Sequence, residues 1–327
     1  MLIPIILLLV GFALLIKGGD WFVDGATGIA RRFRLPELLI GATVVSIGTT
    51  LPEVMVSAGA ALQGSGSIAY GNAIGSIICN TSLIAALTIA IKPSAAPRKS
   101  LIMPVLFFFG SALLYSGIAY LTGYFSLVSG IVLLAIFVTY MISTVLRMKS
   151  MSGELEANAE EPEEAEEGKK SSVLKDIILL VIGAAAIAWG ADLLVDNAIL
   201  IAESLGVSEK VIGLTIVALG TSLPELVTAI TALVKGHSSL SLGNIIGANL
   251  FNLVLVSGAA ITLNPFEVPA SSYVGGINSS LVIDIPVMFA VMLILTVPTL
   301  IRQKLSRVQG IAMLLIYAAF IAFQFIF

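Results

Sequence analysis

Thr43-Val-Val-Ser-Ile-Gly-Thr-Thr-Leu-Pro-Glu53 recurs 172 residues later as Thr215-Ile-Val-Ala-Leu-Gly-Thr-Ser-Leu-Pro-Glu225, and these two stretches decide the fold. At the same offset, Gly71-Asn-Ala-Ile-Gly-Ser-Ile-Ile-Cys-Asn80 corresponds to Gly243-Asn-Ile-Ile-Gly-Ala-Asn-Leu-Phe-Asn252. A register that holds without a gap over this length indicates an internal duplication.

The composition places both copies in a membrane. Of the 327 residues, 58% are hydrophobic and only 11% are charged, whereas soluble domains are about 25% charged. A helix needs about 20 apolar residues to cross a bilayer, so we predict an all-α integral membrane protein with ten transmembrane helices. The apolar runs place these helices near 2–17, 37–62, 70–91, 101–121, 126–147, 173–193, 209–234, 242–263, 282–302 and 308–327.

Two five-helix repeats are expected to flank an acidic linker. The linker carries eight glutamates between Glu154 and Glu167, and it is predicted to be solvated and disordered because it has almost nothing to bury. A calcium-sensing role is the alternative, although the segment contains no spaced Asp/Asn/Gly loop of the EF-hand type. The predicted units are residues 1–147, 148–172 and 173–327, with the duplicated motif at about 37–91 and about 209–263.

Lys and Arg residues assign the two sides of the membrane, because cytoplasmic loops retain positive charge. If the ten helices cross in alternation, sixteen of the seventeen Lys and Arg residues fall on one side and Lys210 alone falls on the other. This places the linker in the cytoplasm and both termini outside a plasma membrane. Because five helices separate equivalent positions, the second repeat is inverted, an architecture typical of transporters with a site near the midplane.

Glu53 and Glu225 are the residues that most need a functional explanation. Both fall near the middle of predicted helices, where a charge costs at least about 2.5 to 3.5 kcal/mol, and neither helix carries a Lys or Arg in its interior. We therefore expect the partner to be a transported cation, a proton, or both in turn. With one Cys and one His in the chain, soft ligands are scarce, so a bound cation is expected to be held by oxygen.

Hydroxyl groups and freed carbonyl groups accompany both glutamates. A proline inside a helix cannot donate to the carbonyl four residues before it, and a freed carbonyl at membrane depth is tolerated where it faces protein, water or an ion. The alternative is a packed proline kink with hydroxyls bonded to their own helix. The prolines are Pro52 and Pro224, the freed carbonyls belong to Gly48 and Gly220, and the hydroxyls one turn before the glutamates belong to Thr49, Thr50, Thr221 and Ser222.

Further polar residues lie on the neighbouring helices. Asn80 is one turn from Ser76 and shares its face, and Asn252 repeats the asparagine in the second copy. Their amides are candidate cation ligands or contacts between helices. The glycines at Gly71, Gly75, Gly243 and Gly247 are expected to permit close helix packing. Capping or water contact is expected at predicted helix ends for Asp20, Asp24, Asp192, Asp196 and Asp284.

In these motifs the sequence resembles the cation/Ca2+ antiporter superfamily, and within it the Na+/Ca2+ exchangers of prokaryotic type. The resemblance rests on the paired Gly-Thr-[Thr/Ser]-Leu-Pro-Glu and Gly-Asn-x-Ile-Gly-x-x-x-x-Asn segments, called alpha repeats in that family, and it covers both halves of the chain. It implies exchange of Na+ for Ca2+, usually three for one, at sites between the second, third, seventh and eighth helices. It also implies that the long first and sixth helices slide to alternate access.

The resemblance carries a set of ligands over to this chain. Two departures stand out: Asn252 occupies a position where many members have an aspartate, and Ala248 replaces a serine that helps to bind one sodium. The first leaves two formal charges, enough to balance one Ca2+, and the second weakens one outer sodium site. The implied side-chain ligands are Thr49, Thr50, Glu53, Ser76, Asn80, Thr221, Ser222, Glu225 and Asn252, with backbone carbonyls from Ser46 and Ala218.

We therefore expect a secondary antiporter in which Ca2+ and Na+ compete for the two glutamates. H+/Ca2+ exchange by the same glutamates is the nearest alternative, although the neighbouring hydroxyls favour sodium. A cation channel would need a ring of ligands, usually from oligomeric symmetry, and a membrane enzyme would need a nucleophile or metal triad beside the carboxylates. We expect no cofactor and no nucleic-acid partner; the bilayer, Ca2+ and Na+ are the expected partners.

Overall fold

The computed structural model describes residues 2–157, 173–205, 220–270 and 273–326. Within these ranges, nine helices are long and apolar enough to cross a membrane, and the protein is an all-helical, multi-pass membrane protein. The predicted helix at 209–234 is described only in its second half, as α11 (Leu223–Val234). The nine spans are Leu2–Arg32, Glu37–Leu62, Gly66–Ile91, Arg98–Thr122, Leu127–Ser150, Val173–Ser204, Ser238–Leu263, Ser280–Arg302 and Arg307–Gln324.

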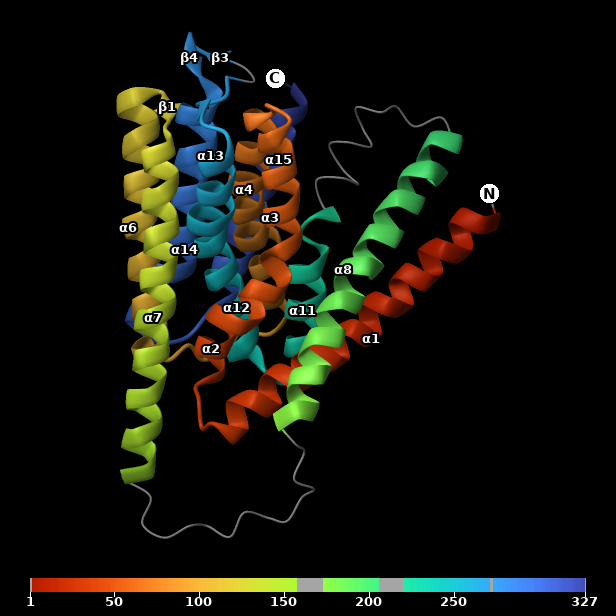
Figure 1. The fold of residues 1–327 in the computed structure, drawn as a ribbon, viewed down its shortest axis with the longest axis vertical. Coiled ribbons are helices and arrows are strands. Elements are labelled where there is room, and N and C mark those ends of the chain that lie inside the picture. The colour runs from red at the N-terminus through yellow and green to blue at the C-terminus, as the bar shows by residue number, and fades with distance from the viewer. Residues whose placement is uncertain (1, 158–172, 206–219, 271–272, 327) are drawn as a thin grey trace.

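Two long helices, α1 (Leu2–Arg32) and α8 (Val173–Ser204), form an antiparallel pair that lies obliquely against the other helices (Figure 1). They are the first helices of the two predicted repeats. Their opposite directions are what an inverted duplication requires. The amino terminus and carboxyl terminus lie at the same end of the molecule (Figure 1).

Glycines allow the backbones of α1 and α8 to touch. A Cβ added at Gly11 would lie 2.8 Å from the Gly190 carbonyl oxygen, and one at Gly190 would lie 2.9 Å from the Gly11 carbonyl oxygen. Gly18 and Gly183 face each other in the same way, at 3.0 and 2.8 Å. Gly183 is the repeat equivalent of Gly11, and Gly190 is the repeat equivalent of Gly18. Each contact therefore joins a glycine to the repeat equivalent of the glycine in the other contact. We call these four residues the glycine seam.

The remaining helices form an upright bundle beside this pair (Figure 1). Three of its spans contain a π-helical turn in the middle, and a fourth begins with one. The elements are α2 (Glu37–Ile40), η1 (Gly41–Val45) and α3 (Ser46–Leu62); α4 (Gly66–Cys79), η2 (Asn80–Ala85) and α5 (Ala86–Ile91); α6 (Arg98–Thr122); α7 (Leu127–Ala157); α12 (Ser238–Phe251), η4 (Asn252–Val256) and α13 (Ser257–Leu263); η5 (Ser280–Asp284) and α14 (Ile285–Arg302); and α15 (Arg307–Ile326).

The interruptions preserve the duplication in the backbone. η2 begins at Asn80 and η4 begins at Asn252, which are equivalent residues. A π-helical turn leaves backbone groups outside the regular ladder and occurs often at functional sites. The equivalence of these turns indicates that the two asparagines occupy matching environments.

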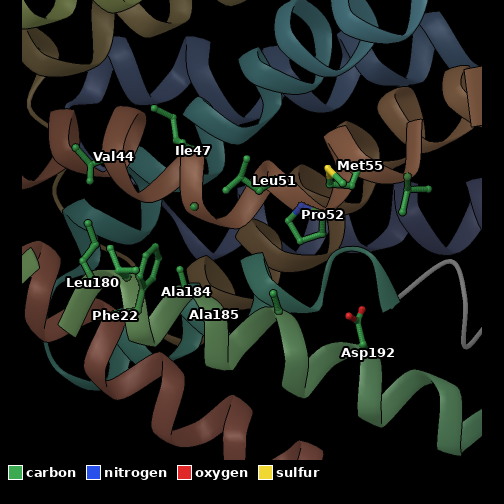
Figure 2. Close-up of a pocket in the computed structure, with 14 residues that line it drawn as sticks. Phe22, Val44, Ile47, Leu51, Pro52, Met55, Leu180, Ala184, Ala185 and Asp192 are labelled. Carbon is green, nitrogen blue, oxygen red and sulfur yellow. The ribbon is translucent and has the colours of Figure 1, made fainter. Parts of the chain in front are cut away.

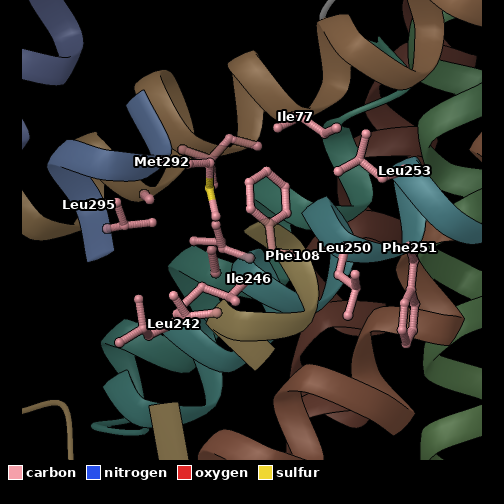
Figure 3. Close-up of a cluster of buried hydrophobic side chains, with 14 of the residues drawn as sticks. Ile77, Phe108, Leu242, Ile246, Leu250, Phe251, Leu253, Met292 and Leu295 are labelled. Carbon is pink, nitrogen blue, oxygen red and sulfur yellow. The ribbon is translucent and has the colours of Figure 1, made fainter. Parts of the chain in front are cut away.

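Apolar side chains fill the centre of the bundle around α12 (Figure 3). Phe108 of α6 lies beside Ile246 and Met292, and all three are completely buried. The α12 helix is buried along most of its length, because it contacts α2, α3, α6 and α11. It is therefore a fixed element on which the surrounding helices are arranged.

Short backbone pairings join the helix ends. β1 (Tyr124–Phe125) pairs with β2 (Phe266–Glu267), and β3 (Tyr273–Val274) pairs with β4 (Ile277–Asn278), both antiparallel. At the opposite end, Ala95 pairs with Lys304. The β1–β2 pairing and the Ala95–Lys304 pairing tie connections of the first half to connections of the second half, whereas β3 and β4 both belong to the second half.

Three predicted boundaries were wrong. α1 continues to Arg32 rather than ending near 17, so Lys17 lies inside a helix and not in a loop. α8 similarly continues to Ser204 rather than ending near 193. α7 extends to Ala157, so the first part of the predicted linker at 148–172 is helical; residues 158–172 lie outside the described residues. Polar and charged residues that we assigned to loops are thus accommodated within helices.

Candidate functional site

Glu53 lies inside α3, one residue after the helical Pro52. Its side chain is completely buried. Its two carboxylate oxygens make no hydrogen bond within the described residues, and it forms no salt bridge with them. A buried carboxylate without a partner is strongly unfavourable, so the surroundings of Glu53 are suited to a cation.

Glu225 occupies a different backbone position. It lies in the first turn of α11, with Pro224 at the start of that helix and Ser222 as the preceding residue. Directly before α11, Thr221 and Ser222 form a turn; residues 209–219, the first part of the predicted helix, lie outside the described residues. Glu225 is completely buried and, within the described residues, its carboxylate oxygens also lack hydrogen bonds.

The two glutamates lie on helices that pack against each other, α3 and α11. Both carboxylates are buried, so their negative charges repel each other with little screening by water. Two negative charges facing each other in a buried space balance one divalent cation, whereas any smaller positive charge leaves a residual repulsion. The electrostatics of the pair thus favour occupation by cations.

Several neutral polar side chains on the helices of the two glutamates and on the elements packed against them also have buried atoms without partners. Carbonyl oxygens of amides and hydroxyl oxygens are ligands that Ca2+ accepts alongside carboxylates. Within the described residues, buried side-chain oxygens without a hydrogen bond include those of Thr50, Asn80, Ser222, Thr228, Asn249 and Asn252. Unsatisfied buried oxygens are rare in folded proteins, and these lie on or next to α3, α11, α12, η2 and η4, elements that pack together around the helices of the two glutamates.

Asn80 and Asn252 lie on π-helical turns that pack against the helix of the other repeat's glutamate. The η2 turn that begins at Asn80 contacts α11, the helix of Glu225, and the η4 turn that begins at Asn252 contacts α3, the helix of Glu53. Both asparagines are completely buried. Each half of the protein thus supplies an amide to the neighbourhood of the other half's glutamate.

The remaining predicted ligands are placed unequally. Thr49 and Ser46 are buried and already donate hydrogen bonds to Asn244, Thr49 to its side chain and Ser46 to its carbonyl. Ser76 is buried on α4, and Thr221 is partly exposed. Ala218 lies outside the described residues.

Two asparagines at equivalent positions were missed. Asn72 donates to the Glu53 carbonyl oxygen at 3.2 Å and to the Ser57 hydroxyl at 2.9 Å. Asn244 accepts a hydrogen bond from Thr49 at 3.2 Å. The signal was present in the sequence, since both residues are the asparagine of the repeated Gly-Asn pair.

The aspartates predicted as helix caps have other surroundings. Asp20 and Asp24 lie within α1, and the Lys235 ammonium group pairs with Asp24 at 2.8 Å and with Asp20 at 3.4 Å. Lys235 follows α11, so this ion pair holds α1 against the helix of Glu225. Asp284 makes no cap hydrogen bond and accepts one from Gln324 at 3.4 Å.

The equivalent aspartates of α8 are also within the helix rather than at its end. Asp192 lies at the edge of a cavity of about 770 Å³ between α3 and α8 (Figure 2). The cavity is otherwise apolar, and its lining includes Pro52 and Leu51 but neither glutamate. It separates part of α8 from α3 and is unsuited to holding a cation.

Comparisons with known proteins identify the family of the chain. The sequence profile of a family described as "Sodium/calcium exchanger protein" matches residues 3–146 and 175–326. A protein of Methanosarcina acetivorans named sodium/calcium exchanger MaX1 is 32% identical over 98% of this chain and 98% of its own. The putative antiporter CaxA of Alkalimonas amylolytica is 35% identical over 100% of this chain and 99% of its own.

Solved structures show the same fold. The sodium-calcium exchanger NCX_Mj, in a structure soaked with Na+ and Sr2+, is 34% identical to this chain and superposes with a TM-score of 0.81, covering 98% of each chain. Among the sequence relatives, an uncharacterized membrane protein of Methanocaldococcus jannaschii is 36% identical over 96% of this chain and 95% of its own.

Proposed function

The chain belongs to the sodium/calcium exchanger protein family and is a cation/Ca2+ antiporter, and from this premise we propose that it exchanges Na+ for Ca2+ at a site built on Glu53 and Glu225. The observation that carries the proposal is the pair of buried carboxylates that, within the described residues, lack any hydrogen bond or cationic partner. The protein is a transporter and not an enzyme, because members of this family are transporters.

The site couples the two ions by competition. One Ca2+ neutralises both glutamates, and several Na+ neutralise them in its place. An unoccupied site leaves two repelling carboxylates in a region of low dielectric constant, which disfavours movement of the helices around an empty site. Exchange follows because access to the site changes only when one of the two ions occupies it.

The movement is a displacement of the α1 and α8 pair relative to the upright bundle. The glycine seam supports this, because backbone contact along α1 and α8 makes them one rigid unit. The apolar cavity between α3 and α8 adds to the support, since it leaves part of α8 without packing against the bundle (Figure 2). Neither glutamate belongs to the moving pair, so the ions stay on the bundle while access changes.

We place the protein in the plasma membrane with both termini outside. The support is the distribution of positive charge: Arg31 and Arg32 end α1, and Arg302 ends α14, at the end of the molecule opposite the termini (Figure 1). Positive charge marks the cytoplasmic side of membrane proteins.

Vesicles containing the purified protein test which ion drives Ca2+ transport. Vesicles loaded with Na+ and diluted into Na+-free medium with isotopic Ca2+ are expected to accumulate Ca2+, because outward Na+ movement drives Ca2+ inward. Vesicles loaded with choline at acidic pH are expected to accumulate little. Uptake driven by the proton gradient alone would assign H+/Ca2+ exchange to the same fold, and uncoupled conductance would indicate a channel.

Ala248→Ser tests the asymmetry between the repeats. A serine at this position matches Ser76 of the first repeat, and its added hydroxyl is expected to strengthen apparent Na+ affinity about 2- to 5-fold while leaving the KM for Ca2+ nearly unchanged. The measurement is the Na+ concentration for half-maximal inhibition of Ca2+ uptake. Ala260→Ser, at another buried helical alanine, is the matched control. Equal effects of the two serine substitutions would show that position 248 does not belong to a sodium site.

A further inference from the structure

We propose that Asn244 is a positioning residue that holds the Thr49 hydroxyl in the orientation of a cation ligand. The inference rests on the proposed function, because it assigns a task within the site of Glu53 and Glu225. Asn244 lies on α12, in the second repeat, whereas Thr49 lies on α3, in the first. The contact therefore joins the two halves directly at the glutamates.

The hydroxyl of Thr49 donates to the Asn244 side-chain oxygen at 3.2 Å. Thr49 lies on α3, which packs against α11, the helix of Glu225, so the Glu225 carboxylate is the competing acceptor in the proposed site. Thr49 is 2% exposed and Asn244 is 0% exposed, so water competes weakly for either acceptor.

A hydroxyl group has a single proton, and the direction of that proton decides what the oxygen offers. When the proton points to Asn244, the oxygen lone pairs of Thr49 are free to face a cation near Glu225. When it points to Glu225, the hydroxyl occupies a carboxylate lone pair that a cation would use. By accepting this hydrogen bond, Asn244 leaves both the Thr49 oxygen and the Glu225 carboxylate oxygens available to a cation.

The backbone of Asn244 is held firmly enough for this task. Its carbonyl oxygen accepts a hydrogen bond from Ser46 at 2.9 Å. The glycines on either side also press against the first repeat: a Cβ at Gly243 would collide with the Leu38 carbonyl, and one at Gly247 with the Ser46 hydroxyl. These contacts fix α12 against α2 and η1, so the position of the Asn244 side chain relative to Thr49 is also fixed.

The repeat equivalent shows that the role is specific to one half. Asn72 uses its amide nitrogen to donate to the Glu53 carbonyl oxygen and to Ser57. Asn244 uses its amide oxygen to accept from Thr49, and within the described residues its nitrogen makes no hydrogen bond. The same residue type therefore fixes a helix in one half and orients a hydroxyl in the other.

A double-mutant cycle tests the proposal. The variants Asn244→Ala, Thr49→Val and their combination are compared by the Kd for isotopic Ca2+ on purified protein and by the KM for Ca2+ uptake. Each single variant is expected to weaken Ca2+ about 5- to 10-fold. The combination is expected to be no weaker than Thr49→Val alone, since Asn244 acts through that hydroxyl. Asn244→Leu repeats the cycle with a side chain that leaves no void.

Thr50 provides the matched control. Its hydroxyl is completely buried and makes no hydrogen bond within the described residues. Asn244→Ala and Thr50→Val should therefore have effects on Ca2+ affinity that multiply. If Asn244→Ala weakens Ca2+ equally in the Thr49→Val background, or changes only thermal stability, the assignment is overturned. Absence of Ca2+ binding by the unmodified protein would instead reject the proposed function, and because Kd needs no gradient, the result is independent of whether Na+ or H+ drives exchange.

Discussion

Glu53→Gln and Glu225→Gln are each expected to reduce Ca2+ uptake by at least about 100-fold, with the protein still folded. A carboxylate in contact with a divalent cation contributes several kcal/mol even at an effective dielectric constant of about 20, and glutamine removes the charge while keeping the shape. Within the described residues neither carboxylate makes a hydrogen bond that glutamine would break. The measurement is uptake of isotopic Ca2+ by vesicles, accompanied by the thermal unfolding curve of each variant.

Glu267→Gln is a suitable control, because Glu267 is exposed in β2 at the end of the bundle. It should transport Ca2+ at the unmodified rate. Transport retained by both glutamine variants of the buried pair would exclude Glu53 and Glu225 as the shared site. Loss of transport with a collapsed unfolding curve would point to a structural role for the carboxylates.

Gly183→Leu is expected to separate α1 from α8 and to abolish transport. A Cβ at this position would lie 2.5 Å from the Phe22 amide nitrogen and 2.8 Å from the Gly18 carbonyl oxygen, and backbone atoms cannot move aside as a flexible side chain can. Overpacking of this kind costs about 3 kcal/mol of stability. The unfolding temperature of the purified protein and Ca2+ uptake by vesicles measure the two effects.

Gly110→Leu serves as the comparison. Gly110 lies within α6, is exposed, and has no described atom within 4 Å of an added Cβ. Its replacement should leave the unfolding temperature and transport nearly unchanged. If Gly183→Leu were equally harmless, the α1 and α8 pair would not be the rigid unit on which the proposed movement depends.

The helical class, the inverted arrangement and the burial of both glutamates were predictable from sequence. Each follows from local information: apolar length predicts the spans, and the constant offset of 172 residues predicts equivalent positions with opposite directions. The carboxylates stood out because a charge within an apolar run needs a partner. These features do not depend on which helices touch.

Features that depend on distant contacts were not predictable. The first helix was ended too early because Asp20 and Asp24 resemble loop residues, whereas Lys235, more than 200 positions away, neutralises them inside the fold. The different backbone positions of Glu53 and Glu225 were not predictable either, since both residues end the same motif. The contact between Thr49 and Asn244 arises only when the two repeats pack together.

The glycine seam also has a consequence for the origin of the molecule. Gly11 meets Gly190 and Gly18 meets Gly183, so each contact pairs one position with the duplicate of the other. A surface that matches itself in this way is what two identical chains form about a two-fold axis. A half-length ancestor inserted in both orientations could already have closed this contact as a homodimer, before the genes for the two halves were joined.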